Sequence, residues 1–148
     1  MQRKIIPDIV KRKSIASVVG EDSITKAAKL MADANIAALI VVDQDDMITG
    51  ILTERDLTQR VMAKELDAKT TLCQAIMTAN PDTLEASSSA GDALELMQSR
   101  GYRHLPVAEN GKCIGMVSIR DLYAAAKETL EENIRETEAF VFGDRYGA

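Results

Sequence analysis

The chain has 148 residues and a formal net charge of −5, with 46% hydrophobic and 28% charged residues. These values are typical of a globular protein with one ordinary domain or two very small ones. The acidic balance argues against nucleic-acid binding, and the lack of a long apolar run argues against a membrane span or a signal peptide. With only two cysteines and one histidine, neither a zinc site nor a disulfide framework is expected. We expect a cytoplasmic protein.

The first half of the chain predicts a helix, a hairpin and a second helix. Residues 23–35 place apolar side chains at the i, i+3, i+4 and i+7 spacing of a helix with one buried face. The continuous apolar run at 37–43 predicts a strand that is buried on both faces. Polar residues at 43–46 predict a turn into a second strand at 48–53. A helix from about residue 55 to 64 closes the unit.

The second half repeats this pattern. Residues 50–57 (GILTERDL) are echoed by residues 115–122 (GMVSIRDL) at an offset of 65. The preceding strand residues 40–42 are matched with residues 105–107 at the same offset. A unit of this size buries too little surface to be stable alone. We therefore expect the two copies to pack sheet against sheet about a pseudo-two-fold axis.

The helices before these strands match at a different offset. Residues 27–31 (AAKLM) and 93–97 (ALELM) lie 66 apart, which we interpret as a one-residue deletion between Met97 and Leu105. The segment 63–72 is then the linker. The predicted divisions are a first repeat with an N-terminal arm, a second repeat and a helical tail, at residues 1–66, 67–126 and 127–148.

The end of the chain predicts one long amphipathic helix. Its stripe recurs at three- and four-residue steps, with Glu and Arg between the positions, which are Leu122, Ala126, Leu130, Ile134, Thr137 and Val141. Such a stripe either covers its own domain or meets a second subunit. The pattern leaves both arrangements open.

Each repeat carries a hydroxyl at the end of a strand and an acid three residues later. The first copy is Thr53 with Asp56, and the second is Ser118 with Asp121. The hydroxyl and the first-turn N–H groups can contact a phosphate, because helix N-termini favour anions. The carboxylate can accept hydrogen bonds from vicinal sugar hydroxyls. The same pattern is also an ordinary helix cap, but two equivalent copies after apolar strands favour a binding site.

This tandem pattern resembles the CBS domain, and the pair resembles the arrangement called a Bateman module. The resemblance covers about residues 5–125 and rests on four segments, 37–42 (AALIVV), 50–57 (GILTERDL), 102–107 (YRHLPV) and 115–122 (GMVSIRDL). It implies an α/β (α+β) fold of two β-α-β-β-α units with two clefts between them. It also implies binding of AMP, ADP, ATP, NAD(H) or S-adenosyl ligands. Short bacterial members commonly form flat dimers, so a homodimer is expected.

The resemblance also implies roles for the two motifs. Thr53 and Ser118 face phosphate, while Asp56 and Asp121 bind ribose. The basic side chains of this set are expected to contact phosphate, because guanidinium pairs with phosphate bidentately. The alanines of the first repeat, at 37 and 38, leave space for a flat base. The full predicted set is Ile15, Ala37, Ala38, Thr53, Arg55, Asp56, Arg103, His104, Pro106, Ser118, Arg120 and Asp121.

The two repeats differ where the clefts are expected. Arg103 and His104 are interpreted as occupying the places of Ala38 and Leu39, so the second repeat offers a basic pair. Asp82 stands where the family usually has an apolar strand residue. The two sites are therefore expected to be unequal.

The sequence predicts a regulatory module that senses adenine nucleotides through dimer geometry and acts on an unidentified regulated protein. An enzyme is not expected, because no residues remain for the ~250-residue barrel of nucleotide dehydrogenases that carry such pairs. His104, the sole histidine, has no evident nucleophile beside it, and no catalytic cofactor is expected. The alternatives are a structural dimerisation module with vestigial pockets and a regulatory subunit of a separate enzyme.

Overall fold

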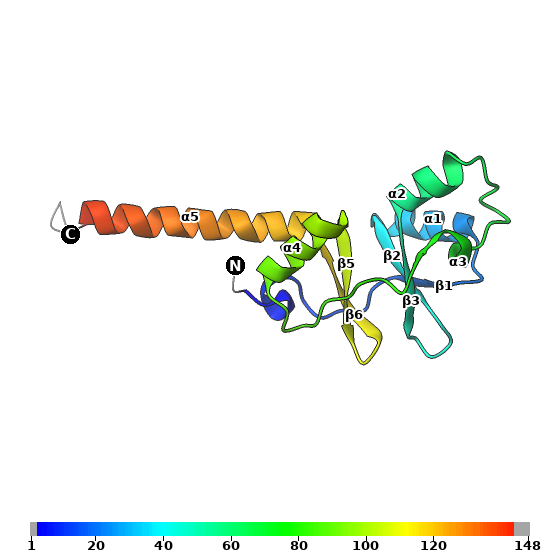
Figure 1. Cartoon of the computed structure of the whole chain (residues 1–148), viewed down its shortest axis with the longest axis horizontal. Coiled ribbons are helices and arrows are strands. Elements are labelled where there is room, and N and C mark those ends of the chain that lie inside the picture. Colours follow the sequence, from blue (N-terminus) through cyan, green and yellow to red (C-terminus); the bar gives the residue numbers. More distant parts are fainter. Residues whose placement is uncertain (1–2, 144–148) are drawn as a thin grey trace.

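Two α/β units lie side by side in the computed structural model, and a long helix projects from the second unit (Figure 1). The structure describes residues 3–143. Met1, Gln2 and the last five residues of the predicted tail, 144–148, lie outside the described part. The predicted fold class, an α/β fold with two repeats and a long C-terminal helix, is confirmed. No helix within residues 3–143 is long and apolar enough to cross a membrane.

The first unit is built on a four-stranded sheet in the order β1-β2-β3-β4. Its strands are β1 (Ser17–Val19), β2 (Ala38–Val42), β3 (Ile48–Thr53) and β4 (Thr78–Ala79). β1 runs parallel to β2, and the other neighbours are antiparallel. Every residue of β2 is buried, as its unbroken apolar run predicts. The resemblance implied a first strand before the helix, but the residue pattern located neither β1 nor β4, because strands of two or three residues are too short to show a period.

The helices of the first unit begin where their capping residues stand. α1 (Ile24–Ala34) starts after Ser23, whose hydroxyl accepts a hydrogen bond from the Lys26 amide at 3.1 Å. The predicted second helix begins as α2 (Glu54–Asp56) and continues as a π-helical segment, η2 (Leu57–Met62). A short helix, α3 (Cys73–Ile76), follows the predicted linker.

The second unit repeats the order helix, strand, strand, helix. Its elements are α4 (Ala90–Arg100), β5 (His104–Glu109), β6 (Lys112–Ser118) and α5 (Ile119–Gly143). Leu84 lies beside β5 as β1 lies beside β2: its amide donates to the Pro106 carbonyl at 2.9 Å, and its carbonyl accepts from the Ala108 amide at 2.8 Å.

The strand registers correct the predicted position of the deletion. Ala38 pairs with Thr53, and His104 pairs with Ser118, so these strands are 66 residues apart and not 65. The offset falls to 65 only after the hairpin turn, which is one residue shorter in the second unit. The prediction that the deletion lies between Met97 and Leu105 was therefore wrong. Arg103 and His104 replace Ala37 and Ala38, because the turn absorbs the length difference without disturbing the ladder.

The N-terminal arm packs on the second unit, although it precedes the first in sequence. Ile5, in the one-turn segment η1 (Ile5–Ile9), is fully buried in the second unit's apolar core. Its amide donates to the Ser88 carbonyl at 2.9 Å, and the Arg3 carbonyl accepts from the Ala90 amide at 2.8 Å. The chain thus ties the two repeats together reciprocally, since β4, near the start of the second repeat, completes the sheet of the first.

A small apolar core joins the two units. Ile40, Val42 and Ile51 are buried there. The partly buried side chains against them are Ile15, Ile48, Cys113 and Met116. The two hairpin ends also meet, since the Ile48 amide donates to the Gly111 carbonyl at 2.9 Å. Contact between the sheets, as expected from the duplication, therefore holds the pair as one body.

α5 is one continuous helix that leaves its own domain. Leu122 and Ala125 are buried against the second unit, whereas every described side chain from residue 130 to 141 is exposed. The apolar stripe therefore packs on its own domain only in the first turns of α5. Farther along, the stripe is exposed.

Candidate functional site

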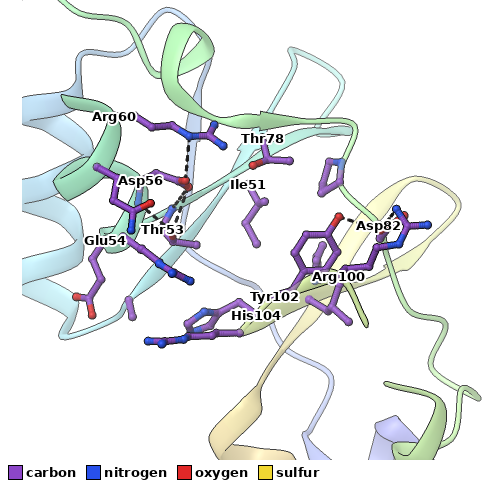
Figure 2. A pocket seen from close by; sticks show the side chains of 18 residues that line it. Ile51, Thr53, Glu54, Asp56, Arg60, Thr78, Asp82, Arg100, Tyr102 and His104 are labelled. Atoms are coloured by element: carbon purple, nitrogen blue, oxygen red, sulfur yellow. Dashed lines mark hydrogen bonds and ion pairs between the residues drawn. The ribbon is translucent and has the colours of Figure 1, made fainter. Parts of the chain in front are cut away.

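A cavity of about 330 Å³ opens between the two repeats (Figure 2). Its volume is within the range of small-molecule sites. One wall is the junction of β3 with α2, and the opposite wall is the loop and strand that follow α4. The lining residues are Ala37, Ile51, Thr53, Glu54, Arg55, Asp56, Gln59, Arg60, Thr78, Pro81, Asp82, Arg100, Gly101, Tyr102, Arg103, His104, Leu105 and Pro106.

The first motif is a capping box that uses one carboxylate oxygen of Asp56, a residue that lines the cavity. Oδ2 of Asp56 accepts hydrogen bonds from the Thr53 amide at 2.9 Å and the Thr53 hydroxyl at 3.1 Å. The Asp56 amide donates back to that hydroxyl at 3.3 Å. Oδ1 lies 3.6 Å from Nε of Arg60. Since capping engages Oδ2, Oδ1 is the oxygen placed to receive a ligand donor.

The guanidinium of Arg60 is held in place by two contacts. Its Nη1 donates to the carbonyl of Ile76 at 2.9 Å, so the guanidinium is held between Asp56 and the end of α3. The equivalent position in the second repeat, at the offset of 65, is Ala125. Arg60 thus distinguishes the environments of the two motif acids.

The second motif forms the same capping box at another place. Oδ2 of Asp121 accepts from the Ser118 amide at 2.8 Å and its hydroxyl at 2.9 Å. Neither residue lines the cavity, and nor does Arg120. The helix-cap function considered for this pattern is therefore present in both repeats.

The structure brings seven of the twelve predicted site residues to one cavity. These are Ala37, Thr53, Arg55, Asp56, Arg103, His104 and Pro106. Ala38 is buried in β2, and Ile15 packs in the core between the units. The cavity thus joins the motif of the first repeat to the basic pair of the second. The similarity between the two repeats could not show that residues of one repeat meet residues of the other in one cavity.

The cavity wall is more basic than the protein as a whole. Four arginines, Arg55, Arg60, Arg100 and Arg103, line it. Three carboxylates, Glu54, Asp56 and Asp82, line it with them, although the chain carries a net charge of −5. Such a mixture suits a ligand that combines an anionic group with hydrogen-bond donors.

Tyr102, Asp82 and Arg100 form a polar cluster that the sequence did not single out as a site. The Tyr102 hydroxyl donates to Oδ2 of Asp82 at 3.0 Å, and Nη1 of Arg100 lies 3.9 Å from the same oxygen. The hydrogen bond to Asp82 raises the pKa of Tyr102. Figure 2 shows this cluster on the opposite side of the cavity from Asp56. Asp82 departs from the family pattern and Tyr102 begins one of the four resembling segments, but neither had been predicted to lie in the site.

His104 lies between acids from both repeats. Burial lowers its pKa below the ordinary value of 6.5, while the charges of Asp121 and Glu54 oppose that shift and Arg103 adds to it. The imidazole is therefore neutral near pH 7. It can accept or donate one hydrogen bond in the cavity, and an incoming anion would favour its protonation.

His104 predicts a pH dependence of stability. Because its pKa is lower in the folded chain than in the unfolded chain, the unfolded state binds the proton first, and stability falls as the pH drops below about 6.5. Replacing His104 with glutamine should flatten this slope in urea unfolding between about pH 5.5 and 7.5. No other histidine titrates in this window, since the chain has one. An unchanged slope in the variant contradicts the prediction.

Curated proteins with similar sequences include YlbB of Bacillus subtilis, which is 38% identical over 102 residues that cover 68% of each chain. The CBS domain-containing protein CBSCBSPB1 of Arabidopsis thaliana is 37% identical over 103 residues, or 70% of this chain. The chain spans 19% of the length of that relative.

Solved structures show the same fold. A candidate signal-transduction protein with CBS domains from Burkholderia ambifaria MC40-6 is 43% identical with a TM-score of 0.72, over 76% of this chain and 82% of that one. At 23% identity, the fold is shared with CBSX2, solved in complex with AMP (TM-score 0.65, 78% and 90% covered). It is also shared with the CBS domain pair of MJ0100, solved with 5′-methylthioadenosine and S-adenosyl-L-methionine (TM-score 0.72, 79% and 91% covered).

The CBS domain family model matches the chain twice, at residues 7–63 and 73–128. The two matches coincide with the duplicated units and with the two capping boxes. The chain belongs to the CBS domain family and carries a tandem pair of its domains.

Proposed function

We propose that this CBS pair binds an adenine nucleotide in the cavity between its repeats and thereby regulates a separate protein. The observation that carries the proposal is the meeting of Asp56 from the first repeat with Arg103 and His104 from the second in one cavity. A nucleotide offers each of these groups a partner, because it combines vicinal hydroxyls, a phosphate and a flat base.

The ribose and the phosphate have different partners in this arrangement. Oδ1 of Asp56 can accept hydrogen bonds from the ribose hydroxyls, since Oδ2 is engaged by Thr53. The arginines at 55 and 103 supply fork-shaped donors that match phosphate oxygens. His104 adds a further donor and, when protonated, a positive charge.

The base has an apolar place and a polar edge. Ala37, Ile51, Leu105 and Pro106 contribute apolar lining, against which a flat ring can pack. Asp82 contributes a carboxylate that accepts hydrogen bonds. An exocyclic amine is a donor, so adenine fits this edge better than a base that presents a carbonyl oxygen there.

The AMP and S-adenosyl complexes of the more distant CBS structures support an adenosine ligand. Because the cavity has one wall on each repeat, a bound nucleotide contacts both and can change how they sit together. A ligand shifts such an equilibrium only through its differential affinity for the two states. We therefore assign a regulatory role and no catalytic one.

Calorimetric titration tests the proposal. AMP, ATP, NADH and S-adenosylmethionine are titrated separately into the purified chain, and mass spectrometry identifies any nucleotide that co-purifies. We expect at least one of them to bind with a stoichiometry near one per cavity. If none binds at millimolar concentration, the proposal is wrong.

Replacing Asp82 with asparagine should reduce discrimination between AMP and IMP. The two ligands differ where adenine carries an amine and hypoxanthine a carbonyl oxygen. A hydrogen bond to a charged acceptor contributes about 1.5–3 kcal/mol, so we expect the preference for AMP to fall by about tenfold. The exposed Asp33→Asn variant is the matched control. Equal AMP-to-IMP ratios in the Asp82→Asn variant and the native chain contradict this assignment, without affecting the role of Asp56.

A further inference from the structure

The outer part of α5 carries apolar side chains that the rest of the described chain does not cover. Leu130, Ile134 and Val141 are 63%, 56% and 49% exposed, and Tyr123, near the start of the helix, is 56% exposed on the same side. Phe140, 75% exposed, lies roughly 100° around the helix from these four. The helix stands away from its own domain over this stretch (Figure 1). An isolated helix of about three turns is marginal in water, and a contiguous exposed apolar surface marks an interaction site.

The exposed stripe lies on a different face of α5 from the residues that pack on the second repeat. Successive helical residues are rotated by about 100°. Leu130 and Ile134 are therefore turned by about a third of a turn away from the buried Leu122 and Ala125. The single stripe expected from the sequence is thus two surfaces, of which one is covered and the other is free.

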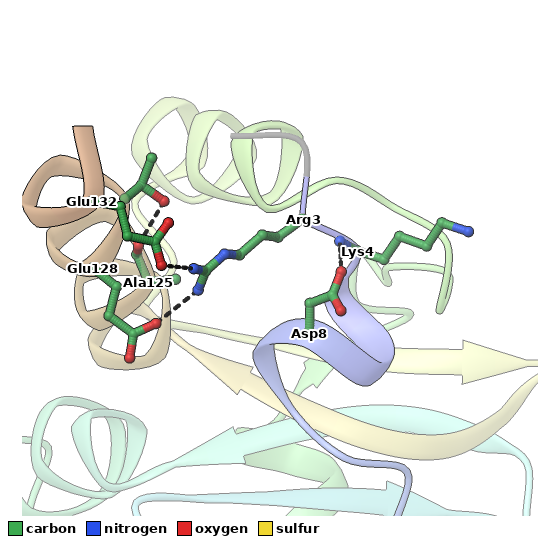
Figure 3. Close-up of polar contacts among 7 residues, drawn as sticks. Arg3, Lys4, Asp8, Ala125, Glu128 and Glu132 are labelled. Carbon is green, nitrogen blue, oxygen red and sulfur yellow. Dashed lines mark hydrogen bonds and ion pairs between the residues drawn. The ribbon is translucent and has the colours of Figure 1, made fainter. Parts of the chain in front are cut away.

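Arg3 of the N-terminal arm reaches two glutamates of α5 (Figure 3). Its Nη1 lies 2.8 Å from Oε2 of Glu128, and its Nη2 lies 3.4 Å from Oε1 of Glu132. The helical rotation places these glutamates roughly half a turn from the stripe. The ion pairs therefore tie the helix to the N-terminal arm and leave the stripe open.

The free stripe has the spacing of a coiled-coil seam. Alternating steps of four and three residues connect Tyr123, Lys127, Leu130, Ile134, Thr137 and Val141. Such a seam fits a second helix with the same repeat. We propose that this stripe docks on the same stripe of a second copy of the chain, with the two helices antiparallel.

The apolar positions complement one another in this direction. When Leu130 lies opposite the partner's Ile134, Tyr123 lies opposite the partner's Val141. The two-fold axis then repeats both contacts. Each copy therefore covers the four apolar side chains of the other copy's stripe, while Phe140 lies beside the seam.

The charged positions select the antiparallel direction over the parallel one. In the antiparallel register, Lys127 lies opposite the partner's Thr137 and beside the partner's Glu138, a carboxylate that attracts the ammonium. A parallel pair instead places Lys127 against the partner's Lys127 inside the seam, where like charges are destabilising. Glu131 approaches its own copy near the two-fold axis, but at the edge of the seam, where water and salt screen the repulsion.

Light scattering after size-exclusion chromatography tests the docking surface across a concentration series. We expect Ile134→Lys to halve the molar mass of the associated species, because it places a lysine in the seam. Ala139→Lys is the matched control, since it adds the same charge to the same exposed stretch on the opposite side of the helix. A native chain that stays monomeric, or a mass that Ile134→Lys does not lower, overturns the proposal. Circular dichroism checks that both variants keep the native helix content.

Cross-linking tests the direction. Chains carrying Tyr123→Cys and Val141→Cys are oxidised separately and as a mixture, in a Cys113→Ser background that retains only the buried Cys73. An antiparallel pair holds the two copies of residue 123 about 27 Å apart along the helices, so the disulfide dimer should form in the mixture alone. A cross-linked dimer from Tyr123→Cys by itself overturns the antiparallel register. Neither experiment depends on nucleotide binding, so this inference and the proposed function can fail separately.

Discussion

Replacing Asp56 with asparagine is expected to weaken nucleotide binding at least tenfold. The substitution keeps an oxygen that can accept the capping hydrogen bonds from Thr53, but it replaces Oδ1 with an uncharged amide nitrogen, which donates hydrogen bonds and cannot accept them. Hydrogen bonds to a charged acceptor contribute about 1.5–3 kcal/mol each, and about 1.4 kcal/mol corresponds to a tenfold change in affinity. Calorimetric titration with the nucleotide that binds the native chain measures the loss.

Asp121→Asn is the matched control for this experiment. It alters the same capping box, with nearly the same distances, at a place that does not line the cavity. We therefore expect the affinity of the Asp56 cavity to fall far less than in Asp56→Asn, with a small loss through His104, whose protonation the charge of Asp121 favours. Equal losses in both variants would mean that the acids act through the helix caps and not through the ligand. Thermal unfolding without nucleotide reports the capping effect on its own.

The second large effect is expected at Ile5, which should cost about 2–5 kcal/mol of unfolding free energy when replaced by alanine. This side chain is fully buried among residues of the second repeat, so its truncation leaves a cavity in a core that lies far from it in sequence. For a chain of this size, the midpoint of thermal unfolding should fall by roughly 10 °C. Urea unfolding followed by circular dichroism measures the free energy directly.

Ile9→Ala provides the comparison within the same arm. Ile9 is half-buried, so the identical chemical change should cost well under half as much. A loss at Ile5 no larger than the loss at Ile9 would contradict the full burial of Ile5 in the second repeat's core. The test also bears on the cavity, because the second repeat supplies Arg103 and His104.

The exchange of segments between repeats gives the cavity its mixed wall. β4 leads from the first repeat to the second and pairs with β3, which brings Thr78 and Pro81 into the lining. The N-terminal arm makes the reciprocal connection, since the Lys13 amide donates to the Ile114 carbonyl at 3.0 Å. The shape of the cavity and the packing of the two repeats are therefore coupled through the backbone as well as through side chains.

Local chemistry made the elements and the duplication readable from the sequence. The helix at 23–35 and the strands at 37–43 and 48–53 were predicted within one or two residues, because apolar periodicity and capping residues act over a few positions. The same holds for Thr53 and Asp56, whose hydrogen bonds span three residues. The repetition of the motif predicted a binding site at both copies; the first copy lines the cavity and the second does not.

Long-range geometry decided the remainder. The equivalence of Arg103 and Ala37 between the repeats depends on which hairpin turn is one residue shorter. Only the pairing of the strands shows this. The joining of Asp56 to Arg103 and His104 depends on how two repeats pack, to which no local pattern contributes. The free stripe of α5 emerged for the same reason: helical spacing identifies apolar positions, but only the packed structure shows which of them the chain itself covers.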